Sequence, residues 1–218
     1  MRTFLIVICF CLLSLSAYGR TLYPLKILKD LDTLTFSKIP ETQYLAKNQS
    51  LTINVRKSAS FYILPLKTPA KVKKVSFRWQ LLTGKLNIDS ARTEETKEGD
   101  DAIFRAGLIT LGKPRAMPWF LPEWLETLGK KLRHPPDRLY WLVAGSRHKK
   151  GVMWESPWSD MVRHISLTGK LQKGWNTEEY TPSPDFPAIT GVMFGSDGDN
   201  SGSSFTVVLR DFQLQLSE

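Results

Sequence analysis

The fold is decided close to the C-terminus, by the stretch from Gly191 to Leu214, GVMFGSDGDNSGSSFTVVLRDFQL. Two runs of apolar, β-branched and aromatic residues flank a short polar segment, Asp197 to Gly202. Such runs predict two strands joined by a tight loop. Patterns of this kind recur along the chain, so the stretch indicates an all-β protein.

Further strands are predicted where apolar and polar residues alternate. In the clearest, Val72 to Leu82, side chains such as Phe77 and Trp79 point one way and Arg78 points the other. The remaining strands are predicted at Leu51 to Val55, Ser58 to Leu66 with its end at Pro65, Asp100 to Leu111, Arg138 to Ala144 and Met161 to Leu167. Because no strand-helix-strand rhythm is present, we expect an antiparallel β-sandwich of the jelly-roll type.

One segment, residues 113–136, interrupts the β pattern. It is rich in proline, and leucines at helical spacing between Pro122 and Arg133 predict a short amphipathic helix. Lys130 and Lys131 near its C-terminal end suit the helix dipole. We expect an insertion that caps one end of the sandwich. Irregular loops are predicted from Gly145 to Asp160 and from Gly174 to Pro187.

The first residues have the pattern of a Sec-type signal peptide. Arg2 precedes an apolar run, Phe4 to Leu15, that is shorter than the roughly 20 residues of a transmembrane helix. Small residues at Ala17 and Gly19 predict cleavage after Gly19. We therefore expect a signal peptide over residues 1–19 and a periplasmic or secreted protein.

Both cysteines, Cys9 and Cys11, lie inside this apolar run. The expected mature chain, residues 20–218, then has no disulfide, no thiol nucleophile and no thiolate metal site. Its length fits one domain, and it contains no second apolar run long enough to cross a membrane. The sequence does not specify an oligomeric state.

The chain is basic, with 30 Lys and Arg against 21 Asp and Glu and a formal net charge of +9. Such a charge suits nucleic acid or another polyanion. Because export removes the protein from nucleic acid, we expect a polysaccharide or another anionic component of the cell envelope as partner. The alternative is a basic surface without a specific partner.

The polar segment from Asp197 to Gly202 resembles the first half of a calcium-binding loop. Asp197, Asp199 and Asn200 are the predicted ligands of a possible structural Ca²⁺. An EF-hand would need a bidentate glutamate where this chain has Val208. Further ligands would come from Asp100, Asp101 or Asp211. The alternative is an ordinary turn, in which these side chains bond their own backbone.

Six residues are the candidate ligand contacts: Arg78, Asp101, Arg105, Trp141, Trp154 and Trp158. Tryptophan rings stack on sugar rings, and arginine binds the carboxylate of an acidic sugar. We expect Arg78, Arg105 and Trp141 on a sheet face, with Trp154 and Trp158 on its rim. Two alternatives stay open: Arg105 pairs with Asp101 within the protein, and the rim tryptophans fold back onto the core.

Catalysis has little support in the sequence. His134, His148 and His164 are scattered, and no HExxH or GxSxG motif is present. We expect a non-catalytic saccharide-binding module and name no catalytic residue. The alternatives are an envelope protein-interaction or scaffold component, and a polysaccharide lyase that uses Tyr140, His164 and an arginine, or another carbohydrate-active enzyme.

Four segments carry a resemblance to a known family: VSFRWQL (Val75 to Leu81), KEGDDAIFRAGLIT (Lys97 to Thr110), LYWLVAG (Leu139 to Gly145) and ITGVMFGSDGDNSGSSF (Ile189 to Phe205). In order and spacing they resemble the exported bacterial family filed as domain of unknown function number 3047. The resemblance implies a sandwich similar to carbohydrate-binding modules, with the Gly-Asp-Asp and Asp-x-Asp-Asn segments as hallmarks. It implies no activity. Residues 113–136 look like extra length, and the segment after Trp175 is a loose match.

Overall fold

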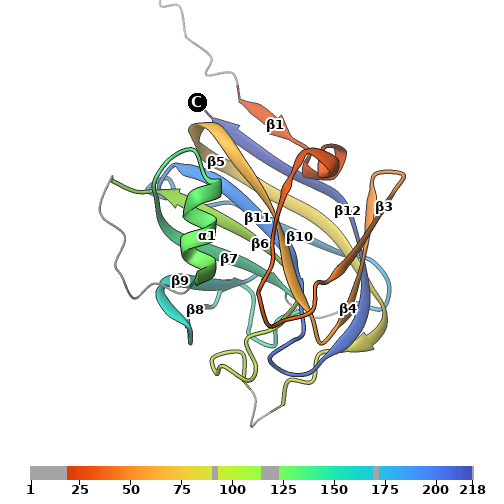
Figure 1. Ribbon diagram of the computed structural model, residues 1–218. Coiled ribbons are helices and arrows are strands. Elements are labelled where there is room, and N and C mark those ends of the chain that lie inside the picture. Colours follow the sequence, from red (N-terminus) through yellow and green to blue (C-terminus); the bar gives the residue numbers. More distant parts are fainter. Residues whose placement is uncertain (1–18, 90–92, 114–122, 169–171, 218) are drawn as a thin grey trace, which may run out of the picture.

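The computed structural model describes residues 19–89, 93–113, 123–168 and 172–217. The predicted signal peptide, up to residue 18, and residues 114–122 of the predicted insertion lie outside these ranges. Within them most residues are in strands and one α-helix is present (Figure 1). The all-β prediction is confirmed. None of the described helices is long and apolar enough to cross a membrane.

The strands are β1 (Arg20–Leu22), β2 (Asp32–Leu34), β3 (Gln43–Lys47), β4 (Ser50–Arg56), β5 (Ala59–Lys85), β6 (Ala102–Leu111), β7 (Pro136–Ala144), β8 (Met153–Ser156), β9 (Ser159–Ser166), β10 (Asn176–Tyr180), β11 (Ile189–Asp197) and β12 (Ser204–Ser217). Helix α1 spans Glu123–Lys131, and two 3₁₀ turns, Pro24–Lys26 and Leu28–Asp30, separate β1 from β2.

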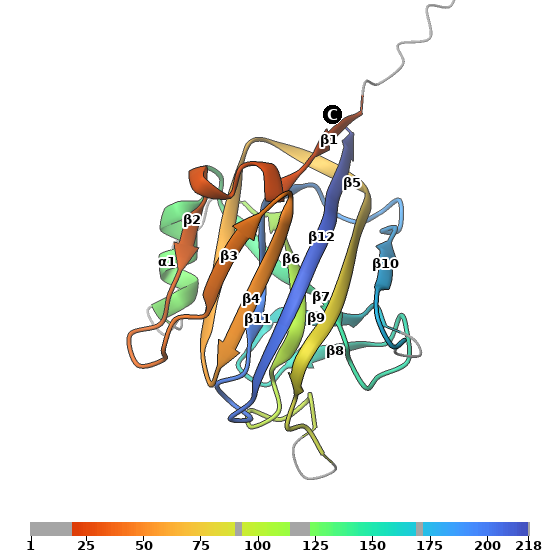
Figure 2. The same cartoon turned by 90° about the vertical axis from the view of Figure 1, so that its right-hand side faces the viewer.

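The strands are hydrogen-bonded in the order β3-β4-β12-β5-β11-β6-β7-β9-β8, without closing into a barrel. The strands form two layers, and the long strand β5 takes part in both (Figure 2). Layer A contains β1, β3, β4, β10, β12 and residues 71–85 of β5, and layer B contains β2, β6–β9, β11 and residues 59–70 of β5. Strands β7 and β9 are parallel, so the sheet is mixed rather than wholly antiparallel. The jelly-roll description stays a prediction.

Strand β5 corrects the prediction of two separate strands, Ser58 to Leu66 with its end at Pro65 and Val72 to Leu82, because one strand covers both. It runs without interruption through that proline. Pro65 lies opposite Gly191, where the register between β5 and β11 shifts. Because an irregular pair tolerates a residue without an N–H group, the proline does not end the strand.

Two predicted loops also contain strands. Strand β8 lies within the expected loop from Gly145 to Asp160, and β10 lies within the irregular segment from Gly174 to Pro187. Both are short and pair with longer strands, β8 with β9 and β10 with β5. These two segments therefore form strands because they pair with a longer strand in the folded protein, and local composition does not reveal such pairing.

The stretch from Gly191 to Leu214 forms two strands and a loop as predicted, but not a hairpin. Strand β11 pairs with β5 and β6, whereas β12 pairs with β4 and β5. The loop between them therefore crosses from layer B to layer A and places its carboxylates at the end of both layers.

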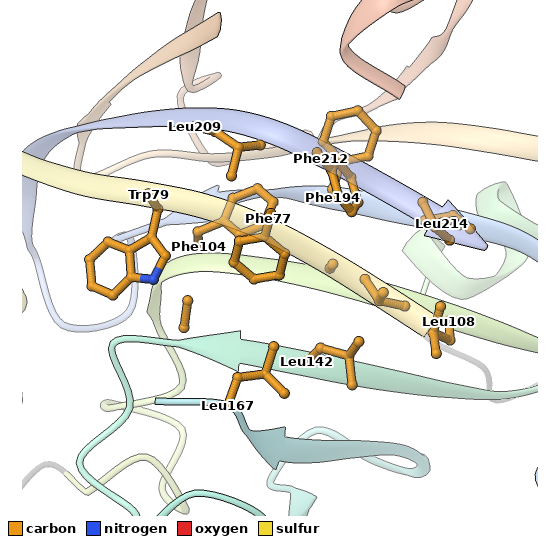
Figure 3. Close-up of a cluster of buried hydrophobic side chains, with 14 of the residues drawn as sticks. Phe77, Trp79, Phe104, Leu108, Leu142, Leu167, Phe194, Leu209, Phe212 and Leu214 are labelled. Carbon is orange, nitrogen blue, oxygen red and sulfur yellow. The ribbon is translucent and has the colours of Figure 1, made fainter. Parts of the chain in front are cut away.

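The main core lies between the layers (Figure 3). Phe77 and Phe212 from layer A meet Phe104 and Phe194 from layer B, with ring centroids of Phe77 and Phe104 4.9 Å apart and those of Phe194 and Phe212 5.1 Å apart. All four are almost fully buried. Burying a side chain of this size contributes about 1.5–3 kcal/mol, so these rings hold the layers together.

A second, smaller core lies on the outer face of layer B. Leu125 and Leu128 of helix α1 pack there with Leu34 of β2 and with Leu139 and Trp141 of β7. The insertion at residues 113–136 was predicted to cap one end of the sandwich. Its helix α1 instead covers the outer face of a sheet (Figure 1). The uncovered remainder of this face is the floor of the candidate site.

Candidate functional site

A cavity of about 210 Å³ opens on the outer face of layer B. Its walls are mostly apolar and aromatic, and one end is polar. The apolar lining comprises Leu34, Phe36, Ile39, Ala59, Phe61, Trp124, Trp141, Trp158, Val162 and Met193. The polar lining comprises Asp100, Arg105, Ser156, Asp197, Asp199 and Asn200. An apolar pocket with a few convergent polar groups is the usual form of a small-molecule site.

Strand alternation explains why a buried arginine faces this cavity. In β6, Phe104 and Ala106 enter the main core, so Arg105 between them points to the outer face. In the neighbouring strand β11, Phe194 enters the core, and Met193 and Asp197 line the cavity. The same alternation that builds the core therefore assembles the polar end.

Arg105 is the centre of a buried ionic network. Its Nη2 donates to Asp197 Oδ2 over 2.7 Å and to the Asp100 carbonyl oxygen over 3.1 Å. Its Nη1 lies 3.3 Å from Asp100 Oδ1 and 3.3 Å from His164 Nε2. Burial alone would lower the pKa of Arg105, but Asp197 and Asp100 outweigh it and raise that pKa. The guanidinium is therefore charged and already committed to two carboxylates.

The carboxylates around Arg105 titrate differently. Burial raises the pKa of Asp197 well above its usual value despite Arg105, with Asp101 and Asp199 adding repulsion. Burial also acts on Asp100, but Arg105 and His164 outweigh it, so the pKa of Asp100 is lowered. Burial and the charge of Asp101 raise the pKa of Asp199 to about 6. The cluster thus holds more negative charge than one guanidinium offsets.

His164 completes the network from β9. Burial lowers its pKa, so the ring is neutral at pH 7. Its Nε2 lies 3.2 Å from Asp100 Oδ1, and we assign the ring proton to this nitrogen because it can then donate to the carboxylate. His164 Nδ1 and Arg105 Nε have no hydrogen-bond partner in the described part of the chain.

Asp101 fixes the loop between β11 and β12. Its Oδ2 accepts the Ser201 amide over 2.7 Å, and its Oδ1 accepts the amide and the side-chain Nδ2 of Asn200 over 3.3 and 3.2 Å. Asn200 Nδ2 also donates to the Asp100 carbonyl oxygen over 3.1 Å. The Gly-Asp-Asp and Asp-x-Asp-Asn segments, far apart in sequence, are therefore in direct contact.

One group of carboxylates could hold a hard cation: Asp101, Asp197 and Asp199 each offer an oxygen within 4.8 Å of the others. Asp101, one of the further ligands that the sequence suggested, thus joins two of the predicted three. Asp211 does not belong to this group of carboxylates, because it pairs with Arg78 on layer A. The side-chain nitrogen of Asn200 donates to the Asp100 carbonyl oxygen and to Asp101 Oδ1, and Asp197 Oδ1 accepts the Ala102 amide over 3.0 Å.

The predicted ligand contacts fall into four places. Arg105 and Trp141 both line the cavity, with the guanidinium carbon 5.4 Å from the centre of the Trp141 ring. Trp158 lies at the cavity with 45% of its surface exposed. Arg78 lies on the outer side of layer A, so the structure does not bring it to the same sheet face. Asp101 braces the loop beside the cavity.

Trp154 has an internal position. Its ring lies between those of His148 and His164, at centroid distances of 4.4 and 5.1 Å. Its Nε1 donates to the Glu94 carbonyl oxygen over 3.2 Å. Because Trp154 is buried and does not line the cavity, its role as a ligand contact stays a prediction with no geometric support.

Sequence reasoning missed several residues that build the cavity, chiefly Phe36, Phe61, Trp124 and Ser156. They come from different parts of the chain, so no spacing links them. The hydroxyl of Ser156 lies 3.3 Å from Asp100 Oδ2, and Asp100 in turn contacts His164. Because the carboxylate stands between the hydroxyl and the imidazole, these groups do not form a serine-histidine nucleophile.

Comparison with known proteins gives one match. No curated protein and no solved structure matches the chain. The model of the family described as protein of unknown function (DUF3047) matches residues 29–213, which include most of both layers and every residue of the cavity. The chain therefore belongs to the DUF3047 family.

Proposed function

We propose that this protein is a non-catalytic saccharide-binding module that holds one sugar ring in the cavity over Arg105. The observation that carries the proposal is that the exposed Trp158 and the carboxylates of Asp100 and Asp199 line one aromatic-walled cavity. A sugar ring matches a cavity with aromatic walls and a polar end, since its C–H faces stack on aromatic rings while its hydroxyls bond carboxylates and amides.

The cavity size supports a single ring. Ligand pockets commonly enclose about 300–1,000 Å³, and this one encloses about 210 Å³. A terminal or protruding sugar unit therefore suits it better than a chain lying along it.

The charge of the polar end supports an uncharged sugar. Arg105 Nη1 already donates to the Asp100 carboxylate and Nη2 to the Asp197 carboxylate, and Asp199 adds a further negative charge. An acidic sugar would add an anion to a site with a carboxylate excess, so we propose a neutral ligand for the cavity. Export to the periplasm or beyond, as part of the same proposal, would place such glycans within reach.

Thermal unfolding in the presence of sugars tests this function. A ligand that binds only the native state raises the melting temperature. We expect N-acetylglucosamine, galactose, glucose or mannose to raise it, and Trp158→Ala to abolish the rise. Glucuronate and galacturonate, as matched acidic sugars, should give smaller shifts. Larger shifts with the acidic sugars would contradict the charge argument.

A carbohydrate-active enzyme is the second candidate. Asp100, with its pKa lowered, and Asp199, with its pKa raised to about 6, line the same cavity, and such a divergence is typical of acid-base pairs. The lyase form has less support, because Tyr140 packs against Phe186 at 5.0 Å instead of joining His164. Release of new reducing ends from neutral glycans, lost in Asp199→Asn, would favour the enzyme.

A scaffold role has weaker support. The exposed large apolar side chains in the described ranges come from different strands and loops, including Leu45, Leu82, Leu111 and Met153. A protein-interaction surface usually gathers such residues into one patch. Retention of an envelope protein by the wild type and by Trp158→Ala alike would favour this role.

A further inference from the structure

The outer face of layer A carries a second cluster, remote from the cavity in layer B. The described segments leave this face uncovered (Figure 2). Inward-pointing residues of its strands, such as Phe77 and Trp79, are buried, whereas Arg78 between them is exposed. In β10, Asn176 and Glu178 are buried, so the alternation directs the preceding residue, Trp175, outward.

Trp175 makes cation–π contacts with two arginines, Arg78 and Arg210. The guanidinium carbon of Arg78 lies 5.2 Å from the centre of its ring, and that of Arg210 lies 4.9 Å from it. The two arginines are direct neighbours across the β5–β12 pair. Like charges in such positions normally repel and destabilise a sheet. The face of a tryptophan attracts guanidinium groups and so offsets part of this repulsion.

A bulge in β12 directs the side chains of Arg210 and Asp211 to the outer face of layer A. The register between β12 and β5 shifts between Arg210 and Gln213, and Asp211 has a left-handed backbone with φ of 53°. Such a conformation costs a non-glycine residue free energy, and bulges of this kind redirect side chains. Here both Arg210 and Asp211 are exposed, while Phe212 still enters the core.

The cluster has one internal anion. Asp211 Oδ2 lies 3.5 Å from Arg78 Nη1, with about half of each side chain exposed. In the described ranges no carboxylate lies within ion-pair distance of Arg210. The two guanidiniums therefore carry an excess positive charge in fixed positions.

The segment that carries Trp175 is itself fixed. Asn176 Oδ1 accepts the Gln172 amide over 2.9 Å, and its Nδ2 donates to the Gly174 carbonyl oxygen over 3.3 Å. Asn176 is buried and pairs with Trp79 of β5. The aromatic platform is thus in place before any ligand arrives, which reduces the entropy that binding must overcome.

We propose that Arg78, Trp175 and Arg210 form an anion-binding subsite for an acidic polysaccharide, separate from the sugar cavity. Guanidinium groups match carboxylate and phosphate oxygens, so one anionic group of the glycan would bridge Arg78 and Arg210. A glycan suits the cluster better than a membrane, because membranes attract broad clusters of several lysines and arginines. Here two fixed cations lie beside an acidic residue that repels an extended anionic surface.

Affinity electrophoresis through gels containing polygalacturonate tests the proposal, with dextran gels as the neutral reference. The test variant is Arg78→Gln combined with Arg210→Gln. The control variant, Lys47→Gln combined with Arg56→Gln, removes the same charge from exposed positions on β3 and β4 of the same layer. We expect polygalacturonate to retard the wild type and the control, and the test variant to bind at least about tenfold more weakly.

Two results would overturn the proposal. Equal weakening in both variants would show a diffuse basic surface without a subsite. Binding of the wild type to vesicles of phosphatidylglycerol and phosphatidylcholine, without retardation by polygalacturonate, would assign the arginines to a membrane. Trp158→Ala should be retarded like the wild type, which separates failure of this subsite from failure of the sugar cavity.

Discussion

Arg105 Nη2 donates to Asp197 Oδ2 over 2.7 Å, and this contact ties the middle of β6 to the last residue of β11. Both side chains are almost fully buried. The pair determines where the polar end of the cavity lies, because Asp197 begins the loop that carries Asp199, and Asp100, just before β6, binds the same arginine.

Replacing Arg105 is expected to be strongly destabilising. Arg105→Met leaves Asp100 and Asp197 buried without their cation, and removing one partner of a buried ion pair costs about 3–5 kcal/mol. Urea unfolding measures this loss. Arg138→Met is the control, because among the described residues the Arg138 side chain bonds only the Asp160 carbonyl oxygen near the surface, so its loss should cost less than about 1 kcal/mol. Equal losses in the two variants would show that the network does not stabilise the fold.

The sequence predicted the strands of this protein better than their partners. Alternation located β4, and runs of apolar residues located β6, β7 and β9, because each of these strands packs at least one face in a core. It did not show that the loop from Asp197 to Gly202 joins two layers, because hairpin pairing and crossing give the same local pattern. Short strands such as β10 depend on a long neighbour and leave no signal of their own.

The candidate site was predicted in part for the same reason. The Gly-Asp-Asp and Asp-x-Asp-Asn segments were identified by composition, and their contact confirms nothing about function. Trp141 and Arg105 were placed together correctly because they lie in adjacent strands. Arg78 was grouped with them wrongly, because β5 presents it on the exposed outer face of layer A, whereas β6 directs the buried Arg105 toward the cavity in layer B. Phe61 and Trp124 had no sequence signal beyond being apolar.

The charge of Asp199 gives a pH-dependent prediction. Its pKa is about 6 in the folded protein and 3.8 ordinarily, so between these values the folded state binds more protons. The contribution of Asp199 to stability therefore falls as the pH rises through this window. Asp199→Asn should gain stability over the wild type from pH 4 to pH 6, reaching about 1–2 kcal/mol at pH 7 after allowance for solvent screening. Urea unfolding at each pH, with EDTA present, measures the difference; a constant difference would contradict the prediction.

Calcium tests the carboxylate group of Asp101, Asp197 and Asp199. Burial and the repulsion from Asp101 raise the pKa of Asp199, and a bound cation would offset both effects. Millimolar calcium should raise the melting temperature of the wild type above its value in EDTA, and should not raise that of Asp199→Asn. Identical melting in calcium and EDTA at fixed ionic strength would show that the hydrogen bonds of Asp101 hold the loop without metal.

Gly107 should control the position of Trp141. A Cβ atom at Gly107 would lie 2.8 Å from Trp141 Cζ3 and 2.7 Å from Leu139 Cδ1, so both side chains would have to move. Gly107→Ala is expected to cost about 1–3 kcal/mol and to push Trp141 into the cavity. Adding Trp141→Phe should recover part of the loss, because phenylalanine is smaller. A double-mutant cycle by urea unfolding measures this coupling, and strict additivity would show that Trp141 does not lie against Gly107.

Binding of neutral glycans to a glycan microarray, by the wild type, Trp158→Ala and Trp175→Ala, tests the sugar cavity most directly. The two variants remove the same side chain, one from the cavity and one from layer A. The account predicts that the wild type binds neutral glycans, that Trp158→Ala binds them at least about tenfold more weakly, and that Trp175→Ala binds them like the wild type. Absence of neutral-glycan binding by the wild type, or equal binding by Trp158→Ala, would contradict it.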